Sequence, residues 1–307
     1  MARLLEGKVA LVTGAGHGIG RGHALELARH GAVVVVNDLG SSVAGEGAGR
    51  DADAVVDIIR TKGGAASPNY GNVADEGDAD AMVAQAITEH GRLDILVNNA
   101  GIVRDRAIWN MSAADFDSVM NVHVRGSWLT SRAAALHWRE RAKASDTGRT
   151  FGRIINTTSG AGLLGNFGQT NYATAKAAIV GLTLTLNVEL NRLGVTANCI
   201  GPGGITRLSA GVSGGTVREP DEYPDGEFDR MDPSLCSPIV AWLCSEEAGH
   251  VSGQVIRAMT EKLWLMQGWT EAVTIDNNSK RWDATKLGDL FATEVFKTRA
   301  TGLRLGG

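Results

Sequence analysis

A glycine-rich segment near the N-terminus constrains the fold of this chain more than any other feature. Residues 13–20 read TGAGHGIG, between a short β-rich run at 8–13 and a stretch at 20–29 whose apolar positions have helical spacing. Such a loop turns tightly and lets a phosphate group approach the backbone at a helix N-terminus. The order of strand, glycine loop, helix and second strand therefore predicts a dinucleotide-binding unit. Its predicted contacts to the dinucleotide are Gly14, His17, Gly18, Ile19 and Gly20.

Asp38 follows the second strand-like run, at residues 32–36. A carboxylate at this position accepts hydrogen bonds from the ribose hydroxyls of the adenosine and repels a 2′-phosphate. Its neighbours, Asn37 and Leu39, bring no positive charge. The sequence therefore predicts NAD rather than NADP as the cofactor.

Strand-like and helical runs alternate along the chain. Further strand-like runs lie at residues 93–97, 154–157 and 195–200, and helical patterns at 52–60 and 79–90. This alternation predicts an α/β fold, a Rossmann-type doubly wound parallel sheet with helices on both faces. We expect a single domain over residues 1–270 and a C-terminal extension over 271–307.

Four segments interrupt this pattern and read as insertions. They cover residues 40–49, 139–152, 206–233 and the tail at 271–307. Long segments without periodicity in compact domains are often lids or binding loops. We expect residues 206–233 to form a substrate lid, because they follow a strand that ends at the predicted ligand edge of the sheet.

Composition limits the classes of partner. The net charge of -4 offers no basic face for nucleic acid. The three cysteines form no C-x-x-C pair and are too few for a disulfide framework, so we expect no metal site. No apolar run reaches the roughly 18 residues that span a bilayer, and charged residues break the N-terminal segment. We therefore expect a cytoplasmic protein that binds no membrane.

A candidate catalytic set follows the strand-like run at 154–157. Tyr172 and Lys176 are four residues apart, so they share one face of a helix. A nearby ammonium lowers the pKa of a phenol and makes it a better acid–base group. Ser159 lies at a strand end, where its hydroxyl could hold the reacting oxygen.

The combined motifs resemble the short-chain dehydrogenase/reductase family over residues 6 to about 257. The matching pieces are TGAGHGIG, Asp38, NNAG at 98–101, Ser159, YATAK at 172–176, and Gly201, Pro202 and Gly203 with Thr206. The resemblance implies a Rossmann fold, nicotinamide-dependent hydride transfer, and a homodimer or homotetramer. It also implies that Ser159 positions the substrate oxygen, that Tyr172 is the acid–base group, and that Lys176 also bonds the nicotinamide ribose.

The same resemblance implies roles for residues at other strand ends. Asp94 and Asn99 are expected near the adenosine half of the cofactor, and Thr206 near the nicotinamide. The remaining implied cofactor contacts are Ala100, Gly101, Pro202 and Gly203. His123 stands where the family usually has an asparagine that supports a water relay to the lysine. It either takes over that role or only supports helix packing.

A narrower resemblance concerns the substrate. NDLG at 37–40, RDR at 104–106, HVRG at 123–126, GNFGQ at 165–169 and WLC at 242–244 look like the dehydrogenase part of multifunctional enzyme type 2 and its stand-alone bacterial relatives. That branch oxidises (3R)-hydroxyacyl-CoA thioesters and, in some members, 17β-hydroxysteroids, in lipid or sterol breakdown. A catalytically silent NAD-sensing protein and a broad carbonyl reductase are the alternatives. Trp109 is a candidate substrate contact.

Overall fold

The structure is a computed structural model. It describes residues 3–209, 216–223, 228–269, 271, 273–276, 278, 281–290 and 294. The chain divides into two compact units, Met1–Leu265 and Met266–Gly307. All the predicted site residues belong to the first unit, and the C-terminal extension lies mostly outside the described residues. A short helix, α10 (Leu287–Leu290), is described within the second unit.

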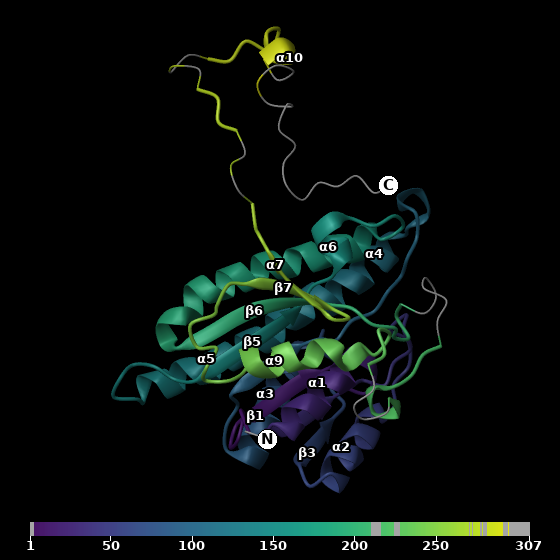
Figure 1. The fold of residues 1–307 in the computed structure, drawn as a ribbon, viewed down its shortest axis with the longest axis vertical. Coiled ribbons are helices and arrows are strands. Elements are labelled where there is room, and N and C mark those ends of the chain that lie inside the picture. The colour runs from purple at the N-terminus through teal and green to yellow at the C-terminus, as the bar shows by residue number, and fades with distance from the viewer. Residues whose placement is uncertain are drawn as a thin grey trace. The chain divides into compact units, whose positions relative to one another are not determined.

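The first unit is built on a largely parallel sheet, which confirms the predicted doubly wound α/β fold (Figure 1). The strand order is β3-β2-β1-β4-β5-β6-β7-β8. The central strands are fully buried apolar runs, as expected where helices cover both faces. The strands are β1 (Val9–Thr13), β2 (Val33–Asn37), β3 (Ala65–Asn69), β4 (Ile95–Asn98), β5 (Gly152–Thr157), β6 (Val195–Pro202), β7 (Val255–Met259) and β8 (Lys262–Met266).

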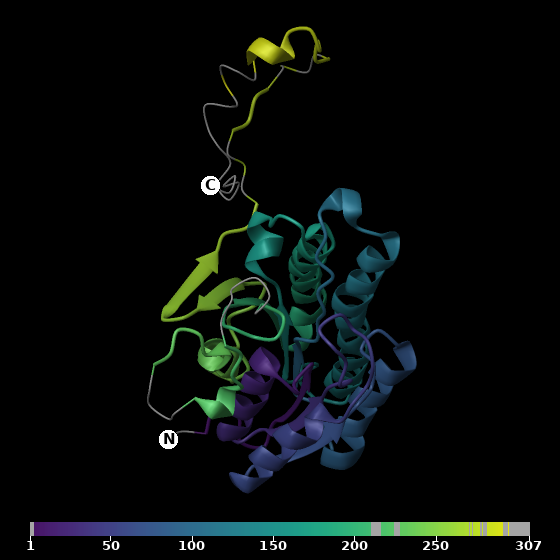
Figure 2. The ribbon, with the colours of Figure 1, turned by 90° about the vertical axis from the view of Figure 1, so that its right-hand side faces the viewer.

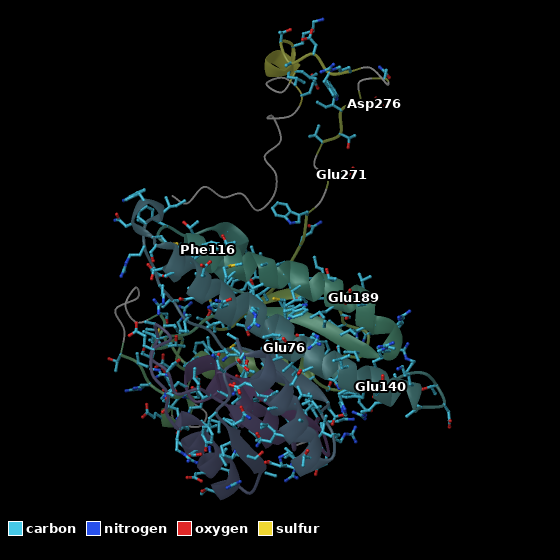
Figure 3. The ribbon with its side chains drawn as sticks, turned by 180° about the vertical axis from the view of Figure 1, so that it is seen from behind. Glu76, Phe116, Glu140, Glu189, Glu271 and Asp276 are labelled. Atoms are coloured by element: carbon cyan, nitrogen blue, oxygen red, sulfur yellow. The ribbon has the colours of Figure 1, made fainter. Side chains whose placement is uncertain are left out.

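Two helix layers cover the sheet, one on each face (Figure 2). One layer contains α1 (Gly18–Arg29), α2 (Asp51–Thr61) and α9 (Ser237–Leu243). Its core includes Leu27, Val55 and Val240. The other contains α3 (Glu76–His90), α5 (Gly126–Lys143) and α7 (Thr170–Leu190), and is seen from outside in Figure 3. Its core includes Met82 and Trp138.

Shorter helices connect these elements. Near β4 and α5 they are η1 (Ile108–Asn110), α4 (Ala113–Met120) and the π-helical turn η2 (Asn121–Arg125). Further along the chain they are α6 (Gly160–Leu164), η3 (Asn191–Leu193), η4 (Pro220–Glu222) and η5 (Pro233–Cys236).

One expectation from the sequence was wrong. The segment 139–152 is not wholly an insertion, because α5 continues to Lys143. One helical stretch, Thr170–Leu193, is long and apolar enough to cross a membrane by length and composition alone. A third of its most apolar window is buried, and it packs against β6 and α6 in this fold. Its apolar character therefore has a structural cause in the covering of the sheet.

Candidate active site

The glycine loop joins β1 to the N-terminus of α1. Gly14 and Gly18 adopt φ of +61° and +52°, in the left-handed region that favours glycine. A Cβ on Gly14 would lie 2.7 Å from the Cα of Ala100, and one on Gly20 would collide with the carbonyl oxygen of Gly14. His17 is the N-cap of α1, but its side chain does not cap the helix. The first turn therefore presents backbone N–H groups, as an anion site requires.

Hydrogen bonds join the glycine loop to the loop after β4. The backbone N–H groups of Asn99 and Ala100 donate to the Thr13 hydroxyl, at 3.0 and 3.1 Å. The Asn99 side chain donates to the carbonyl oxygens of Thr13 and Gly14, at 3.0 and 2.9 Å. The amide nitrogen of Asn99 thus fixes the shape of the cradle, a role that the sequence did not reveal.

Asp38 lies at the end of β2 beside the glycine loop. Its Oδ2 accepts from the backbone N–H of Gly16 at 2.8 Å, and its Oδ1 from that of Gly40 at 2.8 Å. These bonds hold the carboxylate at the wall of the cavity described below. A fixed negative charge here can accept ribose hydroxyls but opposes a second phosphate.

Ser159, Tyr172 and Lys176 meet at the ends of β5 and α7. Ser159 is the N-cap of α6, and its Oγ accepts from the backbone N–H of Ala161 at 3.3 Å. The buried Lys176 donates from Nζ to the carbonyl oxygen of Thr157 at 2.7 Å. Its Nζ lies 5.6 Å from the centre of the Tyr172 ring.

The pKa of Tyr172 differs from what the sequence predicts. Burial raises the pKa of Tyr172, and a hydrogen bond to Ser159 only partly opposes that shift. The expected lowering of the phenol pKa was therefore wrong for the protein alone, because loss of hydration is the largest influence on this pKa. Burial also lowers the pKa of Lys176 to about 8.

His123 lies in the π-helical turn η2, directly behind the Tyr172 ring. The two rings form an edge-to-face pair with centroids 5.3 Å apart. The Nε2 of His123 lies 2.8 Å from the carbonyl oxygen of Ile102, and Nδ1 has no partner among the described residues. Burial lowers the pKa of His123 to about 3, so the ring is neutral. A Cβ on Gly101 would collide with this ring, which explains the glycine there.

The end of β6 completes the site. Gly203 donates its backbone N–H to the carbonyl oxygen of Ala258 at 3.0 Å, and a Cβ on Gly203 would collide with Met259. The half-turn after it brings Thr206 against the glycine loop, where its Cγ2 would lie 3.0 Å from a Cβ on Gly18. Close packing within the protein therefore requires Gly203, whatever the site binds.

With the exception of Asp94, the residues predicted to bind cofactor or act in catalysis line one cavity of about 620 Å³. They are Gly14, His17, Gly18, Ile19, Gly20, Asp38, Asn99, Ala100, Gly101, His123, Ser159, Tyr172, Lys176, Pro202, Gly203 and Thr206. A cavity of this size at the carboxyl edge of a doubly wound sheet is the usual place for a ligand. Within the described residues, no group of three or more His, Cys, Asp or Glu side chains could hold a metal ion.

Asp94 does not belong to this cavity, and its expected place near the adenosine half was wrong. It is fully buried just before β4, at the opposite edge of the sheet from the cavity. There it accepts the backbone N–H of Val9 at 3.0 Å and pairs with Arg92 and Arg141 at 2.7 and 3.2 Å. Its role is to tie β1, β4 and α5 together.

Glu219 also lines the cavity, and the sequence did not predict this. It contacts His17 and Gly18 from a segment about 200 positions further along the chain. The local sequence around it carries no signal for this contact, which depends on how residues 216–223 lie across α1.

Comparison with known proteins assigns the family. The sequence matches the family model of short chain dehydrogenases over residues 8–212. The chain belongs to the short-chain dehydrogenase family. Members of this family are oxidoreductases that use nicotinamide cofactors, and the cradle, the strand-end carboxylate and the Ser159, Tyr172 and Lys176 set are consistent with that class.

Several short-chain dehydrogenases are similar to this chain over most of its length. A Mycobacterium tuberculosis protein named hydroxyacyl-CoA dehydrogenase ChsB1 is 42% identical over 92% of this chain and 87% of the relative. The peroxisomal multifunctional enzyme type 2 of Drosophila melanogaster is 43% identical over 78% of this chain but only 37% of that longer protein. A crystal structure of a short chain dehydrogenase from Mycobacterium avium has a TM-score of 0.85 and 42% identity, covering 99% of this chain and all of the other.

Proposed function

We propose that this enzyme is an NAD-dependent dehydrogenase that interconverts a 3-hydroxyacyl-CoA thioester and its 3-keto form. The observation that carries the proposal is the convergence of Ser159, Tyr172 and Lys176 in the cavity that the glycine loop also lines. The relatives named hydroxyacyl-CoA dehydrogenase and multifunctional enzyme support the choice of substrate class.

The residues of the cradle fit a dinucleotide. The glycines leave room where side chains would collide, and the backbone N–H groups in the first turn of α1 suit a pyrophosphate. Asp38 favours NAD, because its carboxylate would face the 2′-phosphate of NADP. When bound, the nicotinamide supplies the acceptor or donor of the hydride.

The chain's own residues provide the proton chemistry. Ser159 holds the substrate oxygen, and Tyr172 exchanges a proton with it. Because burial raises its pKa, Tyr172 carries its proton at neutral pH, as reduction of a ketone requires. Oxidation of the alcohol needs the deprotonated phenol, so we expect the oxidation rate to rise with pH. Lys176 keeps its charge at neutral pH, and the neutral His123 positions the Tyr172 ring.

An exposed aromatic pair favours a substrate with a large apolar body. Trp109 on η1 and Phe167 before α7 are 74% and 81% exposed, and their rings pair edge to face at 6.2 Å. The Arg106 N–H donates to the Gly168 carbonyl at 2.8 Å, so the two segments are joined. Asn166 and Gln169, on either side of Phe167, line the cavity. An acyl chain or fused rings leaving the cavity could lie on this pair.

We further propose a homodimer or homotetramer that works in the cytoplasm. Large apolar side chains are exposed on the outer faces of α5 and α7, among them Trp128, Leu136, Leu184 and Val188. Exposed apolar side chains on these two helices suit contact with a second copy of the chain. The three cysteines are free and buried, which suits a reducing compartment.

A substrate panel tests the proposal. Purified enzyme is assayed with NAD and 3-hydroxyacyl-CoA thioesters of increasing apolar size, with 17β-hydroxysteroids and with simple secondary alcohols. We expect the highest kcat/KM for the thioesters. Equal rates on unrelated small alcohols would favour a broad carbonyl reductase, and NAD binding without turnover on any substrate would favour a sensor.

A further inference from the structure

A carboxylate of the protein occupies the anion position at the N-terminus of α1. The Oε2 of Glu219 accepts the backbone N–H of Gly18, the first residue of the helix, at 2.7 Å. Its Oε1 lies 2.6 Å from Nδ1 of His17. The Glu219 side chain is only 18% exposed and lines the same cavity as Tyr172. The glycine loop is thus already bound to an anion, one that belongs to the same chain.

The turn that carries Glu219 is fastened to the same helix. We call residues 219–222 the acidic turn, because Glu219, Asp221 and Glu222 belong to it. Both carboxylate oxygens of Asp221 accept from Arg21, at 2.6 and 2.7 Å. Glu222 accepts the backbone N–H of Glu219 at 2.8 Å and closes the turn. The carboxylate of Glu219 is therefore held in place by contacts on both sides.

The raised pKa of His17 agrees with its position between two carboxylates. The hydrogen bond to Glu219 is the largest cause that raises the pKa of His17, and a second bond from Nε2 to Asp51, at 3.0 Å, acts in the same direction. Burial and Arg207 oppose the shift. A protonated imidazole beside the Gly18 N–H attracts an anion of either source, the glutamate or a phosphate.

We propose that Glu219 is an internal competitor of the cofactor: it occupies the pyrophosphate position, and the dinucleotide must displace it to bind. The inference rests on the proposed dinucleotide site. The N–H of Gly18 cannot be shared by a carboxylate and a phosphate, since two like charges would then lie within a few ångströms. The protein thus lowers its own affinity for the cofactor, and Asp221 with Arg21 keeps the acidic turn attached to α1 after Glu219 leaves.

The test compares two ligands that differ in the pyrophosphate. ADP-ribose carries it, whereas adenosine has the same base and ribose without phosphate. Calorimetry gives the Kd of each for the wild type, Glu219→Ala, Glu219→Gln and Glu46→Ala. Glu46 is a matched control, an exposed glutamate on another loop beside the cavity. Among the described residues, its side chain pairs with Arg104 at 3.7 Å.

We expect Glu219→Ala to bind ADP-ribose about tenfold more tightly than the wild type, with adenosine unchanged. Glu219→Gln keeps a neutral hydrogen-bond acceptor, so it should lower the Kd for ADP-ribose by less. Glu46→Ala should leave the Kd of both ligands unchanged. Unchanged or weaker binding of ADP-ribose by Glu219→Ala would overturn the inference, as would equal tightening of adenosine. Failure of every protein to bind ADP-ribose would instead overturn the dinucleotide site itself.

Discussion

Two buried neutral histidines should make the protein lose stability in mild acid. His123 and His23 are 2% and 0% exposed, and burial lowers their pKa values to about 3 and about 4. The folded protein therefore binds fewer protons than the unfolded chain between pH 4 and 6.5. The free energy of unfolding therefore rises with pH in this window. The contribution of the two histidines is fully present above 6.5, the pKa of a histidine in the unfolded chain, and is lost as the pH falls below that value.

The size of this loss follows from the pKa of histidine in the unfolded chain, about 6.5. A solution at pH 5 lies about 1.5 pH units below that pKa, and each unit corresponds to about 1.4 kcal/mol of unfolding free energy. Each histidine should therefore cost about 2 kcal/mol between pH 8 and pH 5, and the pair about 4 kcal/mol. That is a large part of the stability of a typical domain.

Urea unfolding at pH 5 and pH 8 measures the effect at a fixed protein concentration. His123→Gln and His23→Gln should each reduce the pH dependence by about 2 kcal/mol, whatever each does to stability at pH 8. The exposed His250 supplies the control, and His250→Gln should leave the dependence of the wild type intact. If both buried variants keep the full dependence, the histidines are protonated in the folded protein and the reasoning fails.

Three further predictions concern the cofactor, the substrate and the assembly. Asp38→Asn should reduce the preference for NAD over NADP by about tenfold, measured as the ratio of kcat/KM values; an unchanged ratio would remove Asp38 from cofactor selection. Trp109→Ala and Phe167→Ala should each raise KM about fivefold for long-chain thioesters but not for short ones, with kcat unchanged. Val188→Glu, at a position that is 78% exposed, should shift the mass in solution toward the monomer, and an unaltered mass would place the interface elsewhere.

The sequence predicts the strands that are continuous apolar runs, but not those at the edges of the sheet. β3 reads AASPN, and its proline and polar residues indicate a turn. The structure admits Pro68 because β3 is an edge strand, with a neighbour on one side only. The sequence also does not predict β7 and β8. Their buried and exposed residues do not alternate regularly, so the pattern typical of a half-buried strand is absent.

The candidate site could be predicted wherever its residues are close together in the sequence. The glycine loop and the pair of Tyr172 and Lys176 are local motifs, and their spacing already contains their geometry. The environment of each group is not local: burial, which sets the pKa of Tyr172, comes from elements packed around it. The contact of Glu219 with Gly18 depends on a tertiary arrangement for which no residue near either position gives a signal.

The central claim is that Tyr172 performs proton transfer in an NAD-dependent dehydrogenase. The most direct test follows the appearance of reduced nicotinamide with a 3-hydroxyacyl-CoA thioester, while calorimetry measures NAD binding. We predict that Tyr172→Phe lowers kcat by at least about a hundredfold with NAD affinity unchanged. Tyr70→Phe, a matched change on a tyrosine that bonds Arg50, should retain the activity of the wild type. Wild-type turnover by Tyr172→Phe would contradict the account.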